Sequence, residues 1–135
     1  MIHFKFLILF FYPVFSNTFS TEFGECTLEI YGGRINDIPE FVQLILDETK
    51  NLTEEFGPVE LLPFSVYITS NLKDFSEKTQ GPVPEWGIAV AKKKPDRIIM
   101  KAPGVANISF TRMKEVLLHE LNHIYMFRIP SYSTL

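Results

Sequence analysis

The stretch SFTRMKEVLLHELNHIYMFR, residues 109–128, contains neither glycine nor proline and decides how this chain folds. Ser109 or Thr111 can act as the N-cap of a helix that begins here. Apolar side chains recur along the stretch at steps of three and four residues: Phe110, Met113, Leu117, Leu121 and Ile124. This spacing predicts an amphipathic helix whose apolar stripe faces a core.

Within this helix, residues 119–123 read His-Glu-Leu-Asn-His. Helical residues four apart lie about 6 Å apart along the axis and about 40° apart around it, so both imidazoles share one face. His119 and His123 can therefore bind one Zn²⁺ at roughly 2.0 to 2.1 Å, and Glu120 would act as general base on a zinc-bound water. The alternative is a chance match on a solvated helix face.

The composition is that of one globular domain. The chain has 135 residues, of which 46% are hydrophobic and 21% charged, so intrinsic disorder is not expected. The formal net charge is −3, and the longest basic run is Lys92–Lys94, which we interpret as a solvated turn. Nucleic acid is therefore not an expected partner.

The first twenty residues differ from the remainder. A short basic start is followed by an almost wholly apolar run over residues 6–15, which predicts a signal peptide over residues 1–20 and export of the protein, secreted or periplasmic. Cleavage after Ser16 or Ser20 fits the small residues there; the second site is preferred, so the mature chain would begin at Thr21. The run is about half the roughly 20 residues that a membrane span needs, which leaves an N-terminal anchor as the lesser alternative. Cys26 is the sole cysteine, so no disulfide framework is expected.

The order of predicted elements indicates an α+β fold. Period-two alternation and β-branched or aromatic runs predict strands over 26–31, 64–69, 86–91 and 97–100, the last two joined by a turn at 92–96. Helical spacing predicts helices from Ile38 toward Gly57, over 71–78, and over the stretch quoted above. One compact lobe spanning residues 21–135 is expected.

At these residues the chain resembles the thermolysin-like zinc peptidases, and more narrowly the small peptidase MA-like domains of the gluzincin group. The likeness lies in residues 119–123, in the strand pair from 86–89 to 97–100, and in Ile129-Pro130 after the helix. It implies the N-terminal lobe of a zincin-like fold, with a mixed sheet packed on the metal helix. It also implies an edge strand that pairs with an extended peptide substrate, here formed by Trp86, Gly87, Ile88 and Ala89. Packing of Trp86 and Ile88 in the core is the alternative.

The chain departs from that family at the third zinc ligand. In gluzincins a Glu from a second, downstream helix completes the site, but residues 124–135 contain no Asp, Glu, His or Cys. An earlier Asp or Glu could replace it, although no spacing singles one out. The resemblance implies a zinc-dependent metallopeptidase that hydrolyses peptide bonds, here as an incomplete lobe and inactive alone for lack of that ligand. The alternative is a non-catalytic, exported α+β binding module with an incomplete metal site.

Overall fold

A mixed β-sheet and two long helices make up the part of the chain described by the computed structural model, namely residues 15–31, 38–69, 75, 78–79, 87–102 and 106–129. The elements in chain order are β1 (Phe15–Thr21), β2 (Gly24–Tyr31), α2 (Ile38–Phe56), β3 (Phe64–Thr69), β4 (Ala89–Lys92), β5 (Arg97–Lys101) and α5 (Phe110–Phe127). The predicted α+β class is thereby confirmed.

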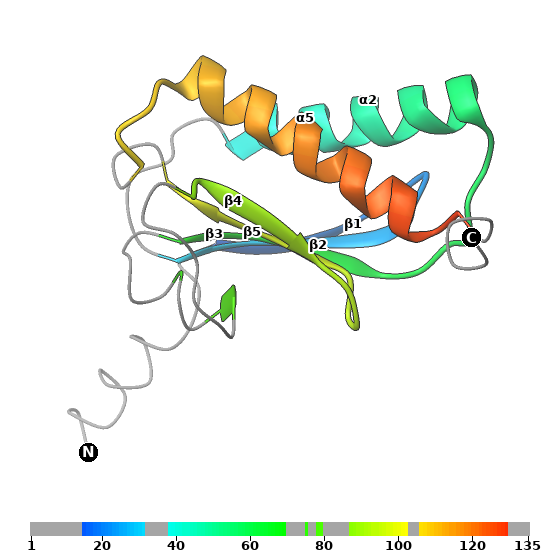
Figure 1. Ribbon diagram of the computed structural model, residues 1–135, viewed down its shortest axis with the longest axis horizontal. Helices are drawn as coiled ribbons and strands as arrows, with labels where there is room; N and C mark the ends of the chain where they lie inside the picture. Colours follow the sequence, from blue (N-terminus) through cyan, green and yellow to red (C-terminus); the bar gives the residue numbers. More distant parts are fainter. Residues whose placement is uncertain are drawn as a thin grey trace.

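The sheet has the strand order β1-β2-β3-β5-β4. Its centre is parallel, because β2 pairs with β3 and β3 pairs with β5 in the same direction. The outer strands β1 and β4 are antiparallel to their neighbours β2 and β5. Figure 1 shows α2 and α5 lying together on one face of this sheet. Among the described residues, β4 is therefore an edge strand on the side of the sheet where α5 packs.

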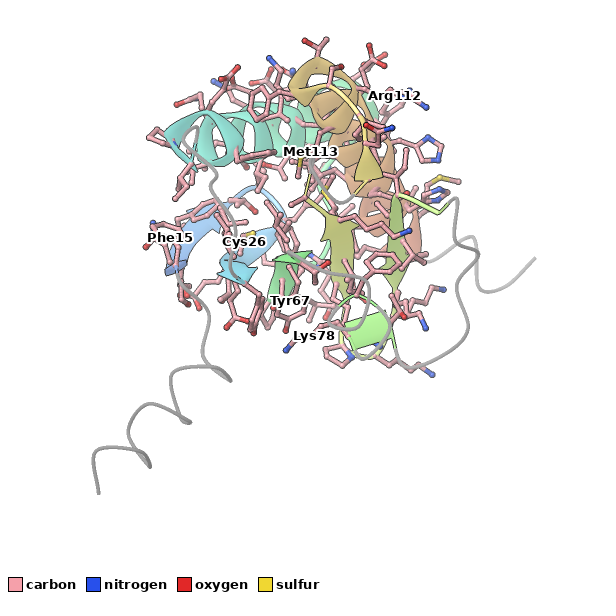
Figure 2. All side chains as sticks on the ribbon, turned by 90° about the vertical axis from the view of Figure 1, so that its left-hand side faces the viewer. Phe15, Cys26, Tyr67, Lys78, Arg112 and Met113 are labelled. Carbon is pink, nitrogen blue, oxygen red and sulfur yellow. The ribbon has the colours of Figure 1, made fainter. Side chains whose placement is uncertain are left out.

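The core lies between the sheet and the two helices. Along β2 the buried side chains alternate with partly exposed ones, as expected for a strand with one face against a core. Figure 2 shows Cys26 of β2 and Met113 of α5 in this layer, whereas Tyr67 and Lys78 lie on the other side of the sheet. The largest fully buried side chains that fill the layer are Phe23, Leu28, Phe41, Ile45, Ile68, Ile98, Met100, Met113, Leu117 and Leu121.

Helices α2 and α5 begin or end at residues that the sequence suggested: α2 ends before Gly57, and α5 begins after Ser109. In α2 the buried side chains recur every three or four residues, at Phe41, Ile45, Thr49 and Leu52. Gly57, with φ of +107°, follows its last residue and donates a hydrogen bond from its N–H to the carbonyl of Thr53 at 2.9 Å. Glycine adopts this left-handed conformation without steric cost, which explains why α2 ends there.

Helix α5 begins at an N-cap serine. The Ser109 hydroxyl oxygen accepts a hydrogen bond from the N–H of Arg112 at 3.1 Å, so one of the two predicted caps is the one used. Helix α5 packs against α2, β4 and β5, and its buried face includes Met113, Leu117, Leu121 and Ile124. The apolar stripe read from the sequence thus faces the core, with Phe110 half-buried at its start.

The strand boundaries differ from the prediction at three places, the smallest difference being in β5, which was expected over 97–100 and extends to Lys101. The strand expected over 26–31 begins at Gly24. It is preceded by β1, and every residue of β1 pairs with a residue of β2. The strand expected over 86–91 runs over Ala89–Lys92, and Trp86 lies outside the described residues. Most of the short helix predicted over 71–78 also lies outside them.

Six of the twenty residues of the predicted leader, residues 15–20, belong to β1. Its Phe15 and Phe19 side chains are half-buried and pack against the core. Cleavage after Ser20 would remove all of β1 except Thr21, whereas cleavage after Ser16 would keep five of its seven residues. In the part of the chain that the structure describes, no helix has the length and apolar character needed to cross a membrane.

Candidate metal and active site

The two predicted zinc ligands converge on the surface of α5. His119 is exposed and His123 half-buried, and their Nε2 atoms lie 3.1 Å apart. The rings are nearly perpendicular, with centroids 4.7 Å apart and an interplanar angle of 82°. Without a metal, an Nε2–H on one ring can donate to the lone pair of the other. The helix thus directs two imidazole nitrogens at one point in space.

Glu120 lies beside the histidines but faces the sheet, and only 7% of its surface is exposed. Desolvation by burial raises its pKa above the usual value for a glutamic acid. Three smaller effects lower the pKa: the charges of His123 and His119, and a hydrogen bond from the backbone of Ala91. A buried carboxylate of raised pKa, held next to two imidazoles, is a stronger proton acceptor than an exposed glutamate.

Strand β4 brings its backbone to this carboxylate. Ala89 and Ala91 oppose Met100 and Ile98 of β5, whose side chains are buried in the core. Because side chains alternate along a strand, both alanines face α5, and their small size lets the helix approach closely. The Ala91 backbone then reaches Glu120. The sequence analysis did not name Ala91 as a site residue. Its position two residues after Ala89, on the same face of the strand, could have indicated it.

The predicted substrate-binding residues lie next to the same strand. Gly87 and Ile88 precede β4, Ala89 is its first residue, and all three are half-buried. The carbonyl of Ile88 accepts a hydrogen bond from the N–H of Lys101 at 2.9 Å, which extends the pairing with β5 by one position. Ile88 also packs against the core, as the alternative interpretation of this residue expected.

The structure brings two histidines together with one carboxylate, and among the residues that it describes no third metal donor lies beside them. Among the described residues, no group of three or more His, Cys, Asp or Glu side chains is arranged to hold a metal ion. Glu120 turns toward β4, where its carboxyl group accepts the hydrogen bond from the Ala91 backbone. Within these residues, the candidate metal ligands are therefore His119 and His123.

A basic side chain also borders the site. The Nζ atom of Lys93, in the β4–β5 turn, lies 4.9 Å from the centre of the Phe127 ring. Phe127 follows His123 by one helical turn, so it extends the same face of α5. Phe127 belongs to the helix that the sequence predicts, but Lys93 belonged to a run that we interpreted as a solvated turn. Lys93 comes close to Phe127 only because the β4–β5 hairpin packs on α5.

Comparisons with known proteins add no relative: no protein-family model matches the chain, and neither the curated proteins nor the solved structures contain a match. The geometry of His119, Glu120 and His123 beside β4 is therefore the basis for a functional proposal.

Proposed function

We propose that this chain is the metal-helix lobe of an exported zinc-dependent metallopeptidase. The observation that carries the proposal is the convergence of the His119 and His123 Nε2 atoms, 3.1 Å apart, next to the buried carboxyl group of Glu120. Strand β4 adds support, because among the described residues it is an antiparallel edge strand beside α5 and an extended peptide can pair with a strand edge.

The two imidazoles fit a zinc ion. Tetrahedral coordination with Zn–N distances of about 2.0 to 2.1 Å separates two ligand nitrogens by roughly 3.3 to 3.4 Å. The observed separation of 3.1 Å needs only a small rotation of either ring. Bound there, zinc would supply a Lewis acid that polarises the scissile carbonyl and makes water more acidic.

The chain's own residues supply proton transfer and positioning. In the proposed reaction, the Glu120 carboxylate accepts the proton of the attacking water and delivers it to the nitrogen of the leaving amine. The hydrogen bond from the Ala91 backbone orients this carboxylate, and the outer edge of β4 aligns the peptide. The roles of Gly87, Ile88 and Ala89 in this alignment follow from their place at the start of β4.

A second candidate function is a binding module of the same fold without catalysis. It is favoured by the lack of a third donor group near the histidines in the described part of the chain. Catalytic zinc sites use three protein ligands and one open position, so the peptidase requires a further donor from outside these residues.

Two substitutions on α5 test the peptidase. His123→Ala should weaken zinc binding by more than about tenfold, because even the loss of a residue supporting a ligand costs 10- to 100-fold. Glu120→Gln should keep zinc affinity and lower peptide hydrolysis by about 10² to 10⁴-fold, since general base catalysis contributes that much. Competition with a chromogenic chelator measures zinc, and cleavage of a quenched peptide library measures hydrolysis.

Asn122→Ala is the matched control, because this residue lies between the histidines yet donates its side-chain hydrogen bond to the carbonyl of Leu118 at 2.7 Å. The control should retain zinc. Equal zinc affinity in His123→Ala and the wild type would exclude the metal site. Zinc binding without any hydrolysis, in the longest gene product that contains this chain, would favour the binding module.

A further inference from the structure

Strand β4 leads from the candidate site into a strongly basic turn. Residues 92–97 contain Lys92, Lys93, Lys94 and Arg97 and a single acidic residue, Asp96. Asp96 is already paired, because its Oδ2 atom lies 3.1 Å from Nε of the buried Arg128 side chain. The turn therefore presents uncompensated positive charge on a chain whose formal net charge is −3.

The turn is held in shape by backbone acceptors. The Arg97 guanidinium donates hydrogen bonds to the carbonyl oxygens of Lys93 and Pro95, at 3.2 and 2.8 Å. Lys92 points to the other face of the sheet, where its Nζ atom bonds to the carbonyl of Thr79. Lys93, the first residue of the turn, lies on the side of α5, where its ammonium group contacts the Phe127 ring.

The positions of Ala91 and Lys93 allow the distance from the proposed reaction centre to the lysine to be estimated. The Ala91 backbone bonds to the Glu120 carboxyl group, and the Lys93 ammonium lies 4.9 Å from the Phe127 ring centre. From Ala91 in β4 to Lys93 in the turn is two residues, about 7 Å of extended backbone, and on α5 the four residues from His123 to Phe127 rise about 6 Å. Lys93 thus lies about two residues of extended peptide away from the proposed reaction centre.

The Lys93 charge is available to a ligand. The side chain is exposed, and among the described residues no carboxylate forms an ion pair with it. Contact with the Phe127 ring attracts the ammonium without neutralising it, so the charge is positioned on the metal face of α5.

We propose that Lys93 forms a subsite for an acidic side chain, so that the site selects peptides with Asp or Glu about two positions from the scissile bond, on the side toward the β4–β5 turn. This specificity rests on the proposed peptidase function. The partner class is therefore an acidic, extended peptide bound along the outer edge of β4.

Peptide binding to the full 135-residue chain tests the subsite without requiring turnover. A fluorescein-labelled ten-residue peptide of Ala, Leu and Ser, with one Glu moved through every position, is titrated against the Glu120→Gln variant with zinc present, by fluorescence anisotropy. One Glu position should bind about two- to fivefold more tightly than the Glu-free peptide, as expected for a partly exposed ion pair. The gain should decline as salt is raised from 0.05 to about 0.5 M.

Substitutions at the lysine separate this subsite from general charge. Lys93→Ala should abolish the gain, and Lys93→Glu should transfer it to a peptide with Lys at the same position. Lys50→Ala is the control, because Lys50 is exposed on α2 and pairs only loosely with Glu54 at 3.9 Å. It should leave the gain unchanged, and circular dichroism should show all variants folded.

The outcomes distinguish the two proposals. If the Glu-free peptide binds but no Glu position improves affinity, or if Lys93→Glu keeps the preference for Glu, the acidic subsite is wrong and the peptidase proposal stands. If no peptide binds to the folded chain, pairing along β4 is wrong and the acidic subsite is overturned with it, whereas the zinc affinity of His123→Ala decides the peptidase proposal separately. Loss of the gain in Lys50→Ala as well would attribute it to net charge and contradict a role for Lys93.

Discussion

Glu120 is an acidic side chain in surroundings that disfavour its charge. Burial next to β4 raises its pKa, and the neighbouring imidazoles and the Ala91 backbone offset only part of that effect. A folded chain retains such a residue at a cost in stability, and perturbed carboxyl groups of this kind gather at functional sites. Ala89 and Ala91 make the arrangement possible because larger side chains there would separate α5 from β4.

Cys26 is a second residue whose chemistry is set by burial. Its side chain is fully buried in β2, and desolvation raises the pKa of the thiol well above its ordinary value. Little thiolate therefore forms in the folded protein, and reagents reach the sulfur only after unfolding. We expect alkylation by iodoacetamide at pH 8 to be more than about 100-fold slower in the native chain than in 8 M urea.

A Glu25→Cys substitution in a Cys26→Ser background provides the control for alkylation. Residue 25 is adjacent but exposed, so its thiol should react at nearly the same rate with and without urea. Mass spectrometry measures both rates. Rapid labelling of Cys26 under native conditions would contradict its place in the core.

At the scale of elements, α5 connects the core to the site. It packs on α2 through an edge-to-face contact of Phe41 with Phe110, whose ring centres lie 5.1 Å apart. The Lys114 ammonium and Glu40 carboxylate form an ion pair at 2.8 Å between the same helices. These contacts hold the start of α5, and the buried side chains of Leu117, Leu121 and Ile124 hold the remainder against the core, so the orientation of His119 and His123 is set by packing as well as by helical spacing.

The N-cap of α5 allows a direct test of this element. Ser109→Ala removes the acceptor for the Arg112 N–H and should lower the free energy of unfolding by about 1 kcal/mol. Thr111→Ala is the control, because Thr111 was the other cap suggested by the sequence and is exposed inside the helix. It should change stability by less than about 0.5 kcal/mol. Urea denaturation monitored by circular dichroism measures both, and equal effects would contradict the assignment of the cap.

The helices could be predicted more fully than the strands, for a physical reason. The long periodic stretches of α2 and α5 carry their own capping and termination signals, Ser109 and Gly57 among them. Strand β1 carries an alternating pattern, FSNTFST, but it directly follows an apolar run and was assigned to the leader. Local composition suits either interpretation, and only pairing with β2 reveals the strand.

At the scale of the whole molecule, the position of the proposed signal-peptide cleavage decides how much of β1 remains, and therefore how stable the sheet is. A chain beginning at Asn17 keeps most of the pairing with β2 and the partly buried Phe19, whereas a chain beginning at Thr21 loses both. We expect the shorter chain to be less stable by more than about 1 kcal/mol, since burial of an aromatic side chain contributes about 1.5 to 3 kcal/mol when complete.

Urea denaturation of the two purified chains measures this difference, and N-terminal sequencing of protein exported by a host cell shows which chain is made. The chain that begins at Asn17 serves as the control for removal of the apolar run. Equal stability of the two chains would show that β1 adds nothing to the fold. An uncleaved N-terminus on exported, membrane-bound protein would support the anchor alternative.

The sequence by itself determined the two long helices, the β4–β5 hairpin, the α+β class and the placement of His119, Glu120 and His123 on one helix, because each rests on local periodicity or spacing. Only the tertiary structure decided the parallel order of β2, β3 and β5, the contact of Ala91 with Glu120, and the position of Lys93 over Phe127. It also decided the pairing of Asp96 with Arg128 across 32 positions of the chain. Such contacts join segments distant in sequence and follow from how helices and sheet bury their apolar faces together, which no local pattern records.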